Sequence, residues 1–296
     1  MTTKARLAKV CTYSLLVFNS MAGILYFRGE NLITVMRLML GFNVTSRPLP
    51  IKLLLPFDAE QSPIYEVLFV ALFVHSMSIM YTVNFLSGLV LTLVFHVSGQ
   101  IDIIHRKFKS FSEKISYYGS SETIGMLVEK HNKVILFSEN VDKLFSFIAL
   151  MQVLGNTLVI CFLGLVFTTV SIAASSARWS NSFSLSNRLM KQSSTGADAD
   201  LLRTIFAYAG ITVEIFMFCF LGEYLGLKNK SLGDAAYESL WYNMSPGHGR
   251  NILFVIMRSQ KHLTITLGGI TNLSLEAFTS IMKASASYMS VLNAMY

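Results

Sequence analysis

Long apolar stretches alternate with shorter polar segments along this chain, at residues 10–27, 67–100, 145–174, 205–221 and 275–296. Each stretch is within the length of about 17–25 residues that one helical membrane crossing needs, or exceeds it. The stretch 67–100 contains no Asp, Glu, Lys or Arg and is longer than one perpendicular crossing, so tilt or projection beyond the lipid is expected. The pattern predicts an all-α, polytopic helical membrane protein with five spans.

Composition agrees with a membrane protein. Hydrophobic residues make up 53% of the chain and charged residues only 14%, and the mean hydropathy is +0.52. Soluble domains carry roughly a quarter charged residues. The net charge of +7 comes from basic residues beside the spans, where membrane topology explains them, so no nucleic-acid partner is expected.

Basic residues predict the orientation. Lys4, Arg6 and Lys9 precede the first apolar stretch and place the N-terminus in the cytosol. Five crossings then place the C-terminus outside the cell. The predicted order is a first span in 1–27, an outer loop at 28–65, a second span at 66–100, a cytosolic helical extension and third span at 101–174, a Ser-rich outer loop at 175–202, a fourth span at 203–224, a cytosolic region at 225–274, and a last helix at 275–296.

The first outer loop contains Asn43-Val44-Thr45, an N-glycosylation acceptor that is usable only on the outer side. Asn43 is therefore a predicted glycosylation site.

Residues 263–270 lead into the last helix. Gly268 and Gly269 are expected to break the chain there, and Asn272 or Ser274 is expected to cap the helix that follows.

The last helix is not uniformly apolar. Glu276, Ser280 and Ser287 share one face at helical spacing, and a helix that faces only lipid has no need of them. Either this face lines water or its small residues pack among other helices. Glu214 raises the same question in the fourth span, where an ionisable side chain must face other helices or water.

Catalytic and metal-binding patterns are not found in the sequence. The six histidines and three cysteines show no HExxH, HxxxH or CxxC spacing, and there is no GxSxG. A transporter would be expected to show an internal repeat with matched broken helices, and none is visible. No enzyme activity, metal or cofactor is predicted.

Five stretches together resemble the insect odorant receptor family. They are LPFDAEQSPIYEVLF (55–69), GQIDIIHRKF (99–108), HNKVILFSENVDKLFS (131–146), GEYLGLKNKSLGDAAYESLWYNM (222–244) and RSQKHLTITLGGITNLSLEAFTSIMKASASYMSVL (258–292). Each alone is weak, but the series occurs in family order over most of the chain.

The resemblance implies a subunit of a tetrameric, ligand-gated, non-selective cation channel in the dendrite membrane of a sensory neuron. Its implied partners are a small volatile odorant, membrane lipid and a shared olfactory co-receptor. Family members have seven spans, and the first two have no counterpart among the five predicted here. The alternatives are a gustatory receptor of the sister class and a truncated, non-functional receptor fragment.

The resemblance also implies site residues. In the family, the last helix lines the pore, and alignment places Val291 and Met295 at a hydrophobic gate, with Ser287 and Ala294 along the conduction path. The odorant pocket lies between spans that correspond here to 10–27, 67–100 and 205–221. Interhelical packing is the alternative role for each pocket residue. The implied odorant-binding residues are Ser20, Ile24, Phe73, Met77, Met80, Phe206, Tyr208 and Ile211.

Overall fold

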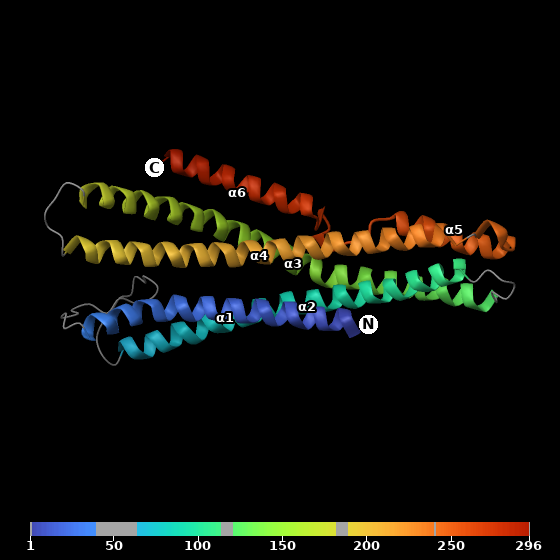
Figure 1. Cartoon of the computed structure of the whole chain (residues 1–296), viewed down its shortest axis with the longest axis horizontal. Coiled ribbons are helices and arrows are strands. Elements are labelled where there is room, and N and C mark those ends of the chain that lie inside the picture. The colour runs from blue at the N-terminus through green and yellow to red at the C-terminus, as the bar shows by residue number, and fades with distance from the viewer. Residues whose placement is uncertain (1, 40–63, 114–120, 182–188, 240, 296) are drawn as a thin grey trace. The chain divides into compact units, whose positions relative to one another are not determined.

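The computed structural model describes residues 2–39, 64–113, 121–181, 189–239 and 241–295. Helices dominate this part of the chain, and a short hairpin interrupts them near the C-terminus (Figure 1). The elements are α1 (Thr2–Met39), α2 (Ile64–Glu113), α3 (Ser121–Asn181), α4 (Leu189–Tyr237), the 3-10 helix η1 (Trp241–Asn243), α5 (Pro246–Gln260), β1 (Thr266–Leu267), β2 (Thr271–Asn272) and α6 (Leu275–Met295).

Within the described residues, four segments are long and apolar enough to cross a membrane: Lys4–Ile24, Val67–Ser110, Ile124–Thr169 and Thr204–Tyr237. They overlap the first four predicted spans, and the predicted class, an all-α helical membrane protein, is confirmed. Helix α6 is not among these four segments, so its crossing and the orientation of the chain stay predictions.

The helices extend further than the hydrophobic pattern predicts. The outer loop was expected to begin at residue 28, but α1 continues to Met39. The Ser-rich segment at 175–202 was expected to be a loop, but α3 continues to Asn181 and α4 begins at Leu189. These extensions contain no Pro, and adding residues to an existing helix costs far less than starting a new one.

The fourth span was expected to end at 224, but α4 continues to Tyr237. The residues beyond 224 include Leu225 and Leu232, which are fully buried. Packing of this face stabilises the helix beyond its apolar stretch.

The chain forms two compact units. Unit 1 comprises Met1–Cys11, Ser87–Leu158 and Val213–Ser287, and unit 2 comprises Thr12–Leu86, Val159–Thr212 and Tyr288–Tyr296. Unit 1 has a dense apolar core, whose fully buried side chains include Leu91, Ile101, Ile104, Phe108, Ile215, Leu225, Leu232, Ile252, Ile265 and Leu273.

Unit 2, like unit 1, exposes many apolar side chains along its helices. Val17, Val70 and Phe85 are 58%, 57% and 68% exposed. Water disfavours such surfaces, whereas lipid or a neighbouring subunit accommodates them. The exposure pattern of unit 2 is therefore that of helices surrounded by membrane.

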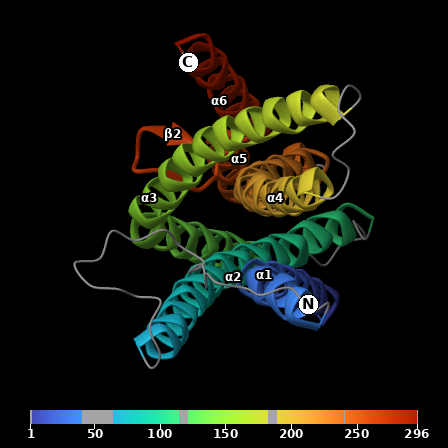
Figure 2. The same ribbon diagram turned by 90° about the vertical axis from the view of Figure 1, so that its left-hand side faces the viewer.

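A tight hairpin precedes α6 (Figure 2). Strands β1 and β2 are antiparallel, with Thr266 opposite Asn272 and Leu267 opposite Thr271. Gly268 and Gly269 connect them with φ angles of 60° and 74°, which L side chains rarely adopt. The helix break predicted at these two glycines is confirmed.

The start of α6 is capped by a serine. The Ser274 hydroxyl accepts a hydrogen bond of 3.1 Å from the backbone N–H of Ala277, as an N-cap residue does. Asn272, the other predicted cap, belongs to β2 instead. Glu276 lies in the first turn, where a negative charge favours the helix dipole.

Candidate functional site

Helices α1 and α2 approach closely in unit 2, at residues predicted to bind odorant. A Cβ built on Gly23 of α1 would lie 2.9 Å from both Met77 Cε and Met80 Sδ of α2. Met77 is buried, and Met80 is half-buried. The structure therefore brings these two methionines together against α1, next to the predicted residue Ile24.

Helix α4 contacts the same region of α1. A Cβ on Gly210 would lie 3.3 Å from Phe18 Cε1 and 3.6 Å from Asn19 Oδ1. Gly210 stands between Tyr208 and Ile211, two predicted pocket residues that are both half-buried.

The remaining predicted pocket residues differ in exposure. Ser20 and Phe73 are half-buried, while Ile24 and Phe206 are 38% and 42% exposed. The separate hollow of about 800 Å³ along α2 is not lined by any predicted pocket residue. It is lined by Val67, Val70, Ala71, Val74, His75 and Ser78.

Sequence reasoning missed a polar pair in this region. Asn19 Nδ2 of α1 donates a hydrogen bond of 2.7 Å to Asn84 Oδ1 of α2, and Asn84 Nδ2 donates to the Met80 carbonyl at 2.8 Å. Amide side chains inside apolar spans could have indicated it, because polar groups there need partners.

The predicted pore residues share one side of α6. Ser287, Val291 and Ala294 are exposed, and their spacing places them on one helical face, with the exposed Tyr288 beside them. Met289 faces α3, where a Cβ on Gly164 would fall 1.5 Å from its Sδ. Met295 was predicted to form the gate with Val291, and its side chain lies outside the described part. The gate remains a prediction.

Glu214 accepts hydrogen bonds from side chains of α2 and α3, all within unit 1. Ser87 Oγ and Gln152 Nε2 donate to Oε1 at 2.9 and 2.5 Å, and Asn156 Nδ2 donates to Oε2 at 3.1 Å. Gln152 Nε2 also lies 2.9 Å from Ser87 Oγ. Of the two environments expected for Glu214, other helices or water, the structure shows other helices.

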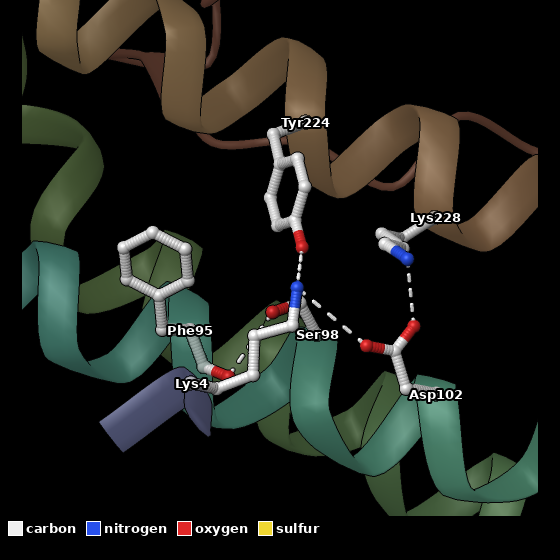
Figure 3. Close-up of polar contacts among 6 residues, drawn as sticks. All are labelled: Lys4, Phe95, Ser98, Asp102, Tyr224 and Lys228. Carbon is white, nitrogen blue, oxygen red and sulfur yellow. Dashed lines mark hydrogen bonds and ion pairs between the residues drawn. The ribbon is translucent and has the colours of Figure 1, made fainter. Parts of the chain in front are cut away.

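A second polar cluster joins α1, α2 and α4 within unit 1 (Figure 3). Asp102 accepts from Lys228 Nζ at 2.8 Å and lies 3.6 Å from Lys4 Nζ. The Lys4 ammonium also donates to the Tyr224 hydroxyl and lies 4.8 Å from its ring centroid. The Asp102 carboxylate thus lies beside two ammonium groups, those of Lys4 and Lys228. The Lys4 ammonium also contacts the Tyr224 phenol.

Metal ligation finds no support within the described ranges, where no three His, Cys, Asp or Glu residues are grouped. The glycosylation site predicted at Asn43 lies outside the residues that the structure describes.

Comparison with known families decides the class. The family described as 7tm Odorant receptor matches residues 3–179 and 188–286, nearly the whole chain. The chain belongs to the insect odorant receptor family. This match includes all four apolar segments, the hairpin and the first half of α6. The family consists of membrane receptors, a class distinct from enzymes.

Curated odorant receptors are similar to this chain at low identity. Odorant receptor 13a of Drosophila melanogaster is 23% identical over 272 residues, which cover 86% of this chain and 60% of that protein. Odorant receptor 10 of Aedes albopictus is 23% identical over 260 residues, which cover 84% and 61%. This odorant receptor chain therefore spans about three fifths of the length of these relatives.

Solved structures share the fold. The olfactory receptor OR5 from Machilis hrabei in complex with eugenol has a TM-score of 0.76 and 16% identity, covering 100% of this chain and 68% of that one. The structure of the same receptor described without a ligand gives a TM-score of 0.69 and 17% identity, covering 98% and 67%.

Proposed function

We propose that this chain is an odorant receptor subunit of a ligand-gated, non-selective cation channel. It binds a small apolar volatile, assembles with the olfactory co-receptor and gates a central pore in the dendrite membrane of a sensory neuron. The family match over residues 3–179 and 188–286 carries this proposal. The orientation is N-terminus inside and C-terminus outside.

The odorant site lies where α1, α2 and α4 approach one another in unit 2. Met77 and Met80 provide flexible, polarizable surface beside Gly23, and Tyr208 and Ile211 flank Gly210. Such side chains suit an apolar ligand, which they bind through dispersion and shape. The structure of the Machilis hrabei receptor holds eugenol, which supports a ligand of comparable size here.

The pore is lined by the exposed face of α6. Ser287 and Ala294 are the small residues on this face. In the assembled channel, the Val291 side chains of the subunits form an apolar ring at the constriction. A narrow apolar ring excludes ions by dewetting and opens when it widens. Val291 is 55% exposed in the single chain. This exposure supports the role, because a pore-lining face is completed only when other subunits assemble beside it.

The test is electrophysiological. Two proteins are each expressed in oocytes with the olfactory co-receptor: this chain, and a version extended by the two N-terminal spans that family members have. A panel of volatiles is then applied to both. At least one form is expected to give odorant-evoked cation currents absent from oocytes that express the co-receptor alone. Surface biotinylation establishes that each protein reaches the membrane. If both forms reach the surface and no volatile evokes current above that control, the proposal is wrong.

A further inference from the structure

One face of α3 carries three residues that contact the hairpin preceding α6. Asp142, Ser146 and Leu150 are spaced four residues apart, so they lie one above another on the helix. We name these three residues the α3 contact face. All of it belongs to unit 1, as do the hairpin and the start of α6.

Asp142 binds the first strand of the hairpin. Its Oδ1 accepts the backbone N–H of Thr266 at 2.6 Å and the Thr266 hydroxyl at 2.9 Å. The other oxygen lies 3.2 Å from the same hydroxyl. Asp142 forms no ion pair with any residue that the structure describes. The hydrogen-bond donors of Thr266 are therefore what stabilises its carboxylate. Hydrogen bonds to an ionised carboxylate are about twice as strong as neutral ones.

Ser146 and Leu150 contact the turn. The Gly268 N–H donates to the Ser146 carbonyl at 3.0 Å. A Cβ on Gly268 would lie 2.7 Å from Leu150 Cδ2, so the turn approaches α3 as closely as glycine allows. Leu150 also lines a hollow of about 540 Å³ with Ala277 and Ile281 of α6.

Helix α4 holds the other end of the hairpin. Gly222 faces Leu273 so closely that a Cβ there would lie 2.2 Å from the Leu273 carbonyl oxygen. Leu273 is fully buried, and its N–H donates to the Ile265 carbonyl at 2.9 Å. Only Ser274 separates Leu273 from α6, so the connection has no slack.

We propose that the α3 contact face positions the hairpin and thereby sets the balance between the closed and open positions of α6. The proposal rests on the proposed function, because it takes α6 as the pore helix. Asp142 and Leu150 are positioning residues, since they act on the pore through the hairpin. A displacement of α3 reaches α6 through these contacts, because Gly268 lies against Leu150 of α3 and only Ser274 separates the buried Leu273 from α6.

Two adjacent glycines provide a matched pair of variants. Gly268→Ala and Gly269→Ala impose similar backbone strain, because both φ angles are positive. Only Gly268 has Leu150 within 4 Å, while nothing lies within 4 Å of a Cβ on Gly269. The Leu150→Ala substitution removes the side chain that a Cβ on residue 268 would meet. The double variant Gly268→Ala, Leu150→Ala is therefore expected to recover part of the hydrogen-exchange protection and of the current ratio that Gly268→Ala loses. Thr266→Val is a milder variant that removes one hydroxyl and keeps the N–H to Asp142, and Thr266→Ser is its control.

The first measurement is amide hydrogen exchange across 264–277 in the purified protein in detergent. Gly268→Ala and Thr266→Val are expected to exchange several-fold faster there than Gly269→Ala and Thr266→Ser. The second is the ratio of saturating odorant-evoked current to basal current in the co-expressed receptor. Gly268→Ala is expected to lower this ratio several-fold relative to Gly269→Ala at equal surface amount.

The outcomes separate the proposals. Equal exchange in both matched pairs would overturn the positioning role of α3. Faster exchange with an unchanged current ratio would retain the contact but exclude its effect on the pore. If the unaltered receptor gives no odorant-evoked current, the proposed function fails, the pore part of the inference fails with it, and exchange alone still decides whether α3 holds the hairpin.

Discussion

At the scale of single residues, Glu214 shows how an ionisable side chain is accommodated within an apolar helix. Three neutral donors, Ser87, Gln152 and Asn156, satisfy its two oxygens. A carboxylate in a span is costly unless such partners compensate for lost hydration. The hydropathy of α4 predicts that Glu214 needs partners, but which residues provide them depends on how α2, α3 and α4 pack.

Replacing Glu214 by Leu should destabilise the receptor. The change leaves the Asn156 amide without its acceptor and removes one of the two acceptors of Gln152 Nε2, of which Ser87 Oγ is the other. A buried polar group left unsatisfied costs about 1–3 kcal/mol. The expected result is a lower melting temperature in detergent, measured by fluorescence-detected size exclusion. The control is Glu129→Leu, because Glu129 is exposed and pairs only with its helical neighbour Lys133 in the described part. Equal melting shifts for the two variants would contradict the role of the cluster.

Met80 tests the odorant site. Met80→Ala removes the thioether that lies against Gly23 and widens the space between α1 and α2. The expected result is a several-fold change in the odorant concentration that gives half-maximal current, because contact with an apolar ligand is lost. Ile79→Ala is the control, since Ile79 is adjacent but 52% exposed. A larger change in this concentration for Ile79→Ala than for Met80→Ala would contradict the proposed location of the odorant site.

At the scale of elements, the helices are longer than their apolar stretches. The Ser-rich stretch at 175–202 has no apolar period and was predicted to be a loop, yet α3 and α4 extend into it. The hydropathy of a segment indicates whether it lies in the membrane. The residue at which a helix ends depends instead on capping residues and on helix-breaking residues such as Gly and Pro. Gly268 and Gly269 were correctly predicted to break the chain, because their positive φ is a property of the turn itself.

Helix α6 yields a prediction about the gate. Val291→Ala shortens an exposed apolar side chain at the proposed constriction and should widen it. Basal cation leak in the assembled channel is expected to rise, while Val291→Ile should keep it low because the ring stays apolar and narrow. Met295→Ala should act like Val291→Ala. Unchanged leak in both alanine variants would remove these residues from the gate.

At the scale of the whole molecule, the predicted orientation depends on the basic residues Lys4, Arg6 and Lys9, which precede the first span. The acceptor at Asn43 is predicted to face outside and to be glycosylated. The acceptors at Asn229 and Asn243 are predicted to lie in the cytosol and to stay unglycosylated. Buried Asn229 instead donates to the Ser259 and Lys261 carbonyls at 2.9 and 3.0 Å.

Glycosidase treatment of protein expressed in insect cells measures this orientation. A mobility shift is expected for the unaltered chain and should disappear in Asn43→Gln. The matched control is Asn243→Gln, which should keep the shift. A shift that persists in Asn43→Gln would reverse the predicted topology.

The linear order of residues was enough for the membrane class, four of the spans and the family, because these depend on local properties. Backbone groups in lipid must be paired within a helix, so an apolar stretch of sufficient length specifies one. The partners of Glu214, the contact of Asp142 with Thr266 and the approach of Gly268 to Leu150 emerged only from the fold. These contacts join residues far apart in the chain, and hydropathy contains no term for which helix packs beside which.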